Sequence, residues 1–271
     1  MIVSETDKQQ GRGRVVLQKD HADLASQLAR AFGNEQFAPL EPRAQMEFLA
    51  LNHDRGWDDT DAAMGRNPLT GLPFSLVNTP IDALLATGPR SIAYNAEQHP
   101  YCGLLAAMHV WGLFHGRYGL SDKIVVDRLS GEAKVKADAM LLGVREQQQQ
   151  LAAWCHEDPY FSRFVAPEKL MQNYKLLQFF DTLSLYFNER VGKDGDGTEF
   201  VHVPQDQTRD CSIDLIPLGH KTYRLSPYPF AQDRLVLNQY AFEIPVSTVD
   251  VDYQSIFANS GLQTETITLV A

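Results

Sequence analysis

Four residues in three separate segments have the right chemistry to bind a metal ion together: His21, the adjacent His53 and Asp54, and Asp181. Asp181 lies in the apolar run 174–187 (YKLLQFFDTLSLYF), so a helix there would direct its carboxylate toward other protein groups. An unpaired carboxylate in such a place is very costly, and a partner must neutralise it. Two imidazoles and two carboxylates that meet at one point would bind Fe, Mn or Zn, with Ni as a further option. We therefore predict a site for one or two such divalent ions.

Helical periodicity is expected to turn these side chains inward. Over residues 17–32 the apolar side chains recur at i, i+3, i+4 and i+7, and His21 falls on the same stripe. A second helix is expected over residues 43–55, opened by a proline, with His53 on its apolar face and Asp54 one step round. Both segments should therefore point their histidines toward the protein core.

The segments that follow are expected to be mainly helical up to residue 190. Helices are predicted over 100–118, 134–156 and 167–190. The first is apolar nearly all round and should be central, and the last carries Asp181. The stretch 57–99 is rich in proline and glycine, so it is expected to be a long loop with one short helix at 81–86. Such a loop is often an active-site lid, and a structural wrap is the alternative.

Beyond residue 191 the apolar pattern changes from a helical period to alternation. Strands are predicted over 212–216, 222–225, 234–237, 240–244 and 264–270. We therefore predict a mostly α protein with three parts: a flexible N-terminus or edge strand at 1–14, a helical domain at 15–190, and a small antiparallel β appendage at 191–271 packed on the helices.

Several short motifs spread over residues 15–270 indicate a family. They are 18–24 (QKDHADL), 52–57 (NHDRGW), 70–73 (TGLP), the run 104–113 that holds His109, and 228–230 (YPF). In these motifs the chain resembles the bacterial DUF3891 family, whose members have no assigned reaction. The order of a His, a His-Asp pair and a late Asp also resembles the HD superfamily of metal-dependent phosphohydrolases. That second resemblance implies an HD-domain-like helical bundle.

The resemblance to the HD superfamily also implies roles for individual residues. Histidines between the His-Asp pair and the last Asp hold a second ion or contact the substrate in that superfamily. His109 is the first candidate for this role, with a core histidine bonded to the backbone as the alternative, and His99 and His115 are further candidates. In catalysis Asp54 would bridge or orient the attacking water, and His109 with Arg55 would stabilise the leaving phosphate.

A phosphorylated substrate needs cationic partners near the predicted ligands. Arg55 and Lys175 are the basic residues closest to the ligands in the sequence, and each is more commonly a surface charge. Trp57 could form one wall of a pocket or pack in the core. We therefore take Arg55, Trp57 and Lys175 as candidate substrate-binding residues.

Composition limits the partners. The chain of 271 residues has 24 Lys and Arg against 34 Asp and Glu, a formal net charge of −10, and no basic stripe that would bind a nucleic acid. Its three cysteines share no CxxC spacing and are expected to be free thiols. The polar start of the chain does not resemble a signal peptide, and no apolar run is long enough to span a membrane. We expect a cytoplasmic protein with a small-molecule partner and no nucleic-acid or membrane partner, and the sequence leaves its oligomeric state open.

Three functions are compatible with these features. The first is a metal-dependent phosphohydrolase acting on a small phosphate ester or nucleotide, in which the ion polarises a phosphoryl oxygen and lowers the pKa of a water. The second is a non-catalytic module that binds a metal or ligand for regulation. The third is a di-iron oxygenase of the HD type, which needs additional histidines between the His-Asp pair and the last Asp. Metal content and a phosphatase screen would separate them.

Overall fold

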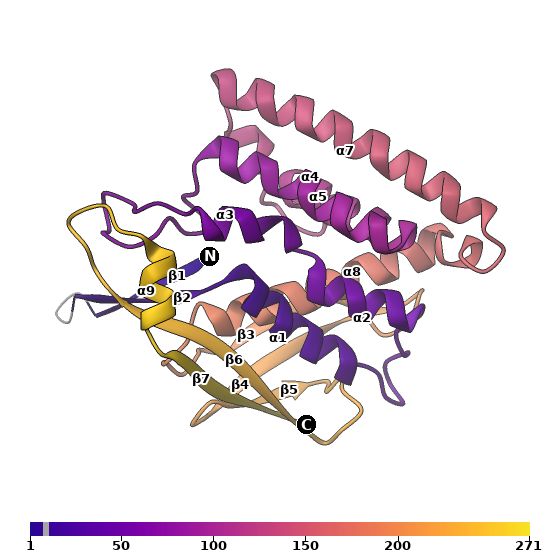
Figure 1. Cartoon of the computed structure of the whole chain (residues 1–271). Coiled ribbons are helices and arrows are strands. Elements are labelled where there is room, and N and C mark those ends of the chain that lie inside the picture. The colour runs from indigo at the N-terminus through magenta and orange to yellow at the C-terminus, as the bar shows by residue number, and fades with distance from the viewer. Residues whose placement is uncertain (8–10) are drawn as a thin grey trace.

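A seven-stranded sheet forms one side of the molecule, and the helices stack on it in layers (Figure 1). The computed structural model describes residues 1–7 and 11–271, with residues 5–7 described by their backbone alone. The strands are β1 (Ile2–Asp7), β2 (Arg12–Val16), β3 (Thr198–Pro204), β4 (Asp210–Gly219), β5 (Thr222–Ser226), β6 (Arg234–Pro245) and β7 (Leu262–Val270). The helices are α1 (Gln18–Ala31), α2 (Arg43–Asn52), α3 (Asp58–Ala62), α4 (Ile81–Gln98), α5 (Pro100–Phe114), α6 (Gly116–Gly119), α7 (Gly131–Glu157), α8 (Pro167–Asn188) and α9 (Tyr253–Asn259), with short 3₁₀ turns at Arg55–Trp57, Val126–Arg128 and Ser162–Phe164.

The sheet is mixed and draws strands from both ends of the chain. Its order is β1-β2-β6-β7-β5-β4-β3. Only the β5–β7 pair is parallel among the strands described, and β2 pairs antiparallel with β6, with Val15 opposite Phe242. The long strands β6 and β7 pair from Arg234 opposite Val270 to Phe242 opposite Leu262. The N-terminal strands therefore extend the same sheet that the C-terminal strands build.

The prediction of a mostly α bundle with a small antiparallel appendage is wrong. Roughly half of the chain is helical, and the sheet is large, curved and mixed. The main hydrophobic core runs without interruption from the helices into the sheet, so that Phe180 of α8 and Leu237 of β6 belong to one buried cluster. A sheet that shares the helices' core is not an appendage, because neither layer buries its apolar face without the other.

The helices that surround the predicted ligands mostly match their predicted positions. Helix α1 buries the expected stripe, and α5 is buried on nearly every side, as its all-round apolar sequence predicts. The prediction of a long loop over 57–99 is wrong in its second half, where α4 spans 18 residues and contains Pro89. The helix continues past that proline because it packs on α5, where Gly88 leaves room for the side chain of Val110.

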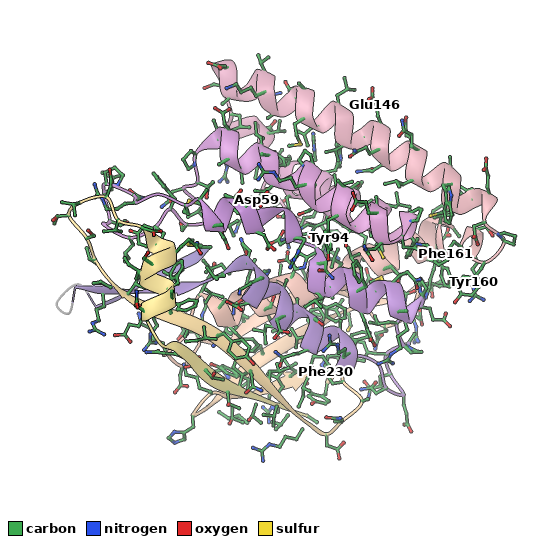
Figure 2. All side chains as sticks on the ribbon, in the orientation of Figure 1. Asp59, Tyr94, Glu146, Tyr160, Phe161 and Phe230 are labelled. Atoms are coloured by element: carbon green, nitrogen blue, oxygen red, sulfur yellow. The ribbon has the colours of Figure 1, made fainter. Side chains whose placement is uncertain are left out.

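The layers differ in how deeply they are buried. Helices α1 and α8 pack on the sheet, α4 and α5 lie above them, and α7 is outermost (Figure 1). Side chains fill the space between the layers, with Phe230 buried beside α1 and Glu146 directed outward from α7 (Figure 2). The predicted ligands sit in the middle layers, between α1, α2, α5 and α8. No helix in the described part of the chain is long and apolar enough to cross a membrane.

Candidate metal centre and adjoining cavity

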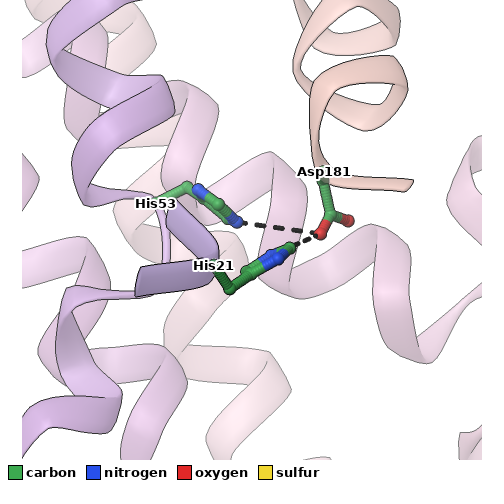
Figure 3. A group of neighbouring side chains, drawn as sticks. All are labelled: His21, His53 and Asp181. Atoms are coloured by element: carbon green, nitrogen blue, oxygen red, sulfur yellow. Dashed lines mark hydrogen bonds and ion pairs between the residues drawn. The ribbon is translucent and has the colours of Figure 1, made fainter. Parts of the chain in front are cut away.

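His21, His53 and Asp181 meet in the buried interior (Figure 3). They come from the first turn of α1, the C-terminal end of α2 and the middle of α8, and each is at most 3% exposed. His21 Nε2 lies 3.1 Å from Asp181 Oδ1, and His53 Nε2 lies 3.7 Å from the same oxygen. Three segments far apart in the sequence thus direct two imidazole nitrogens at one carboxylate oxygen.

Asp54 and His109 extend this cluster toward α5. Asp54 Oδ2 lies 3.7 Å from His53 Nε2, and the ring of His109 lies edge-on to the ring of His53 with centroids 5.3 Å apart. One ligand atom each from His53, Asp54 and His109 lie within 4.8 Å of one another, as do those from His21, His53 and Asp181. The structure therefore brings together all five predicted metal ligands, with His53 common to both groups.

Hydrogen bonds fix which nitrogen of His21 and His53 faces the cluster. His53 Nδ1 donates to the carbonyl of Ala50 at 3.0 Å. His21 Nδ1 lies 3.0 Å from Asn188 Oδ1, and the Asn188 amide N–H donates to Gln239, so the oxygen of Asn188 must accept from His21. With Nδ1 protonated, each ring presents Nε2 to the carboxylates. Metal-binding histidines are usually held in the same way, by a hydrogen bond from the other ring nitrogen.

His53 Nε2 is a buried nitrogen that no protein group among the described residues satisfies. It is fully buried and has no hydrogen-bond partner in the part of the chain that the structure describes. Its distances of 3.7 Å to Asp54 and Asp181 are too long for hydrogen bonds. Two ligand atoms that share one ion at about 2.1 Å are themselves about 3.0 to 3.4 Å apart, close to the 3.1 and 3.7 Å observed here. The donor set and its spacing therefore fit a divalent ion.

The carboxylates set the protonation of the metal-free cluster. Burial alone lowers the pKa of His53, but the nearby charges of Asp54 and Asp181 outweigh burial and raise the pKa to about 9. Burial likewise opposes ionisation of Asp181, but its hydrogen bond with His21 and the nearby imidazoles of His53 and His109 keep the pKa of its carboxyl well below the usual range. Without an ion, protonated His53 thus supplies the positive charge that balances the carboxylates of Asp54 and Asp181.

His109 differs from the other two histidines. Burial is the main reason that its pKa falls to about 4, so its imidazole stays neutral near physiological pH. Its Nδ1 lies 2.8 Å from Gln178 Nε2, and the amide donates to it, which leaves the proton of the neutral ring on Nε2. His109 therefore presents an N–H group toward the cluster.

A cavity of about 760 Å³ opens beside the cluster. His21, Asp54, His109 and Asp181 form one part of its lining, and most of the remaining wall is apolar. This volume is in the range of pockets that hold small organic ligands. A ligand in the cavity would therefore reach the carboxylates and imidazoles directly.

Comparison with known proteins places the chain in a family but assigns no activity. The family described as "Protein of unknown function (DUF3891)" matches residues 1–245. The chain belongs to this DUF3891 family. No curated protein and no solved structure matches it. The function of this DUF3891 member must therefore be argued from its own site.

The predicted substrate-binding residues of this DUF3891 protein lie in different places. Trp57 is buried and lines the cavity. Arg55 lies outside the lining, with its guanidinium 3.2 Å from Asp58 and over the ring of Tyr94. Lys175 pairs with Asp210 on β4, also away from the cavity. Of the three, only Trp57 is in a position to contact a ligand in the cavity.

The remaining candidate histidines lie outside the cluster. His99 precedes α5 and accepts a hydrogen bond from the backbone N–H of Tyr101, while its ring packs on Phe161. His115 follows α5 and stacks on the ring of Trp111 with centroids 3.8 Å apart. Both histidines have structural contacts of their own, so His109 is the additional histidine that adjoins the four-ligand set.

Sequence reasoning missed the residues that support the cluster and the cations that line the cavity. Asn188 and Ser184 contact His21 Nδ1, and both lie one or two turns after Asp181 on α8. That spacing could have indicated them, because residues three, four and seven apart share a helix face. Arg117, Lys123, Arg128 and Arg190 line the cavity. The first three follow the central helix α5 in an irregular segment, where no periodicity predicts the direction of a side chain.

Proposed function

We propose that this protein binds a divalent transition metal ion, Fe, Mn, Zn or Ni, through His21, His53, Asp54 and Asp181, and that it hydrolyses a small phosphate ester. The observation that carries the proposal is the buried Nε2 atom of His53, which faces two carboxylates and has no hydrogen-bond partner among the described residues. An unmade hydrogen bond at a fully buried nitrogen is unfavourable, and coordination to an ion removes the penalty.

The residues of the cluster divide into ligands and groups that face the substrate. A bound ion would supply Lewis acidity and lower the pKa of water at the site. The Nδ1–H group of His21 donates to Asn188, and that of His53 donates to Ala50. These hydrogen bonds orient the two Nε2 atoms toward the ion. Asp54 is partly exposed to the cavity, so its carboxylate can accept a hydrogen bond from an attacking water and orient it.

His109 is placed to act on the substrate itself. Its ring lines the cavity, and the amide of Gln178 keeps the proton on Nε2. A neutral imidazole with a fixed N–H can donate a hydrogen bond to a phosphoryl or leaving-group oxygen without adding charge to the buried site. We assign His109 to this contact, with a second ion as the alternative occupant of its Nε2.

Phosphate ester hydrolysis is supported by two features. The order of a His, a His-Asp pair and a late Asp resembles that of metal-dependent phosphohydrolases. Four cations among the described residues, Arg117, Lys123, Arg128 and Arg190, line the cavity beside the cluster, in a chain whose formal net charge is −10. Placing positive charge beside a metal site favours an anionic substrate.

Metal analysis tests the first half of the proposal. Protein purified without added metal is dialysed, and its metal content is measured by elemental mass spectrometry for wild type, His53→Gln, Asp181→Asn and the matched control His115→Gln. We expect about one ion per wild-type and control chain and a loss of at least about tenfold in affinity for the two cluster variants, because each loses a ligand. Equal metal content in all four proteins would refute the metal site.

A phosphatase screen tests the second half. Wild-type protein loaded with Mn, Fe, Zn or Ni is assayed for phosphate release from aryl, alkyl, sugar and nucleotide monophosphates. Turnover that disappears in His53→Gln but persists in His115→Gln supports the proposal. A metal-loaded protein that releases no phosphate from any member of the panel would identify a binding module instead, and two ions per chain with oxygen consumption would indicate the di-iron alternative.

A further inference from the structure

Four consecutive residues after α5 have a left-handed backbone. The φ angles are 64° at Gly116, 52° at Arg117, 58° at Tyr118 and 86° at Gly119. Glycine adopts this conformation readily, but Arg117 and Tyr118 carry a Cβ atom and are strained in it. Strain of this kind persists only where the surrounding structure enforces it, and it is concentrated at functional sites.

Contacts on both sides hold the turn in place. The Ser121 N–H donates to the carbonyl of Gly116, and a Cβ on Gly116 would lie only 2.5 Å from Ser121 O, so the turn closes tightly. The ring of Tyr118 packs edge-on against Tyr174 of α8, and its hydroxyl donates to Gln148 of α7. Because its neighbour Tyr118 is anchored to two helices, the position of Arg117 is determined as well.

The turn directs Arg117 back to the metal cluster. One guanidinium nitrogen of Arg117 lies 3.7 Å from Asp181 Oδ2, which is an electrostatic contact but too long for a hydrogen bond. The side chain lines the cavity and is 24% exposed. No described group accepts a hydrogen bond from the guanidinium. Its donors therefore face the cavity next to the ligands, in the arrangement that recognises the oxygens of a phosphate group.

The remainder of the cavity has a different character. Its lining is mainly apolar: Val110, Leu113, Phe114, Val125, Met140 and Leu185 belong to it, with fewer polar side chains such as Ser91, Ser121 and Thr182 among them. Lys123 and Arg128 are exposed on the lining, and neither pairs with a carboxylate among the described residues. A sugar or other polyhydroxylated group would place most of its hydroxyls against apolar side chains, which is unfavourable. The cavity therefore suits a molecule with an anionic head and an apolar body.

We infer that the substrate is a phosphate monoester of an apolar alcohol, aryl or alkyl, and that Arg117 binds its phosphate group. This inference rests on the proposed hydrolytic function and specifies its substrate class. In the reaction a water oxygen bonds to phosphorus, the bond between phosphorus and the ester oxygen breaks, and the leaving oxygen takes up a proton. The products are the alcohol, whose body stays against the apolar wall, and inorganic phosphate, which Arg117 contacts beside the cluster.

Calorimetric titration with non-hydrolysable phosphonates tests the inference on the whole protein. Benzylphosphonate has the anionic head and an apolar body, and methylphosphonate has the same head with almost no body. Burying the phenyl ring should make benzylphosphonate bind at least about tenfold more tightly to the wild type. Arg117→Ala should weaken its binding roughly tenfold to hundredfold, because charge-assisted hydrogen bonds are lost. Arg117→Lys keeps the charge, and its affinity should fall between those of the wild type and Arg117→Ala. The matched control Arg224→Ala, at an exposed position of β5, should bind like the wild type.

Metal content measured on the same samples separates a substrate contact from a structural one. We expect Arg117→Ala to retain its ion. Loss of the ion together with binding would show that Arg117 only balances the charge of Asp181, and equal affinity for the two phosphonates would rule out the apolar body. Either result overturns the inference.

The two proposals fail in different ways. A wild-type protein that holds no metal yet binds benzylphosphonate through Arg117 would refute the hydrolytic function and retain the ligand class. If the metal-loaded protein hydrolyses phosphate esters but Arg117→Ala binds benzylphosphonate as tightly as the wild type, the proposed function stands and the inference is refuted.

Discussion

Removing the metal should make the protein less stable as the pH rises from 6.5 to 9. In the metal-free cluster burial opposes the charge on His53, but Asp54 and Asp181 outweigh it and raise the pKa from 6.5 to about 9. A histidine whose pKa is higher in the folded state than in the unfolded state adds stability that is complete below pH 6.5. That stability is lost as the pH rises through the folded pKa, so the window is 6.5 to 9.

The size of the effect follows from the same pKa. One proton bound only by the folded state changes the free energy of unfolding by about 1.4 kcal/mol for each pH unit. Across the window the loss is therefore about 3 kcal/mol, or a fall of roughly 6–12 °C in Tm for a chain of this length. His109, whose pKa is lowered to about 4, and Asp20, whose pKa is raised to about 6, change the stability only at pH values below this window. Burial raises the pKa of the thiols of Cys102 and Cys155 from 9, so these thiols change the stability only at pH values above the window.

Thermal and urea unfolding at pH 6.5 and pH 9, with and without a chelator, would measure this loss. With the ion bound, His53 Nε2 is occupied and the ion competes with the proton, so the stabilisation by metal should increase with pH. In the chelated protein His53→Gln should remove the loss, and the control His115→Gln should keep it. A chelated wild-type protein that is equally stable at both pH values, or a His53→Gln variant with the same loss as the wild type, would refute the reasoning.

Two further substitutions test how the cluster is supported. Asn188→Leu should weaken metal binding about tenfold in a competition assay, because His21 loses its main acceptor while Ser184 Oγ remains 3.1 Å from Nδ1; unchanged affinity would show that this amide does not orient the ring. Gly56→Ala should lower the free energy of unfolding by roughly 2–3 kcal/mol, because its Cβ would lie 2.0 Å from the carbonyl of Thr87. The control Gly65→Ala has no atom within 4 Å and should change stability little, so equal effects would contradict the steric argument.

The helices around the cluster were predictable because their burial is local information. The stripe on α1 and the all-round apolar sequence of α5 indicate how each helix is buried before any partner is known. The pattern fails where packing decides. Helix α4 contains Gly88 and Pro89, which argue for a loop when read locally, and it forms because α5 covers it.

The sheet could not be predicted because its pairing is long-range. Strand β2 finds its partner β6 more than two hundred residues away, and no pattern within β2 indicates that partner. Strand β6 was predicted as two short runs, 234–237 and 240–244, which leave out Asn238 and Gln239. In the structure Gln239 occupies an inward position of one continuous strand, where Asn188 and Glu265 satisfy its amide.

The ligands and the cations of the site differed in how far they could be predicted. Asp181 signals a buried partner by its place among phenylalanines, so the need to neutralise it leads to His21 and His53. The direction of Arg117 depends on a left-handed turn that is marked only by the glycines on either side of it. Closeness in sequence favoured Arg55 instead, but its side chain contacts Asp58 and Tyr94. Distance along the sequence is therefore a poor guide to which cation contacts the site when a left-handed turn redirects the chain.

The sheet reaches the candidate metal site through a chain of hydrogen bonds. Glu265 on β7 accepts from Gln239 on β6, Gln239 accepts from Asn188, and Asn188 accepts from His21 Nδ1. Because β6 also pairs with β2, whose last residue lies two positions before α1, the sheet sets both the place of His21 and its tautomer. A fragment ending at residue 191 would retain every predicted ligand but would lack the amide that fixes Asn188. The predicted ligands alone therefore do not make the site, because the tautomer of His21 is set through a residue on a strand that the ligand pattern does not include.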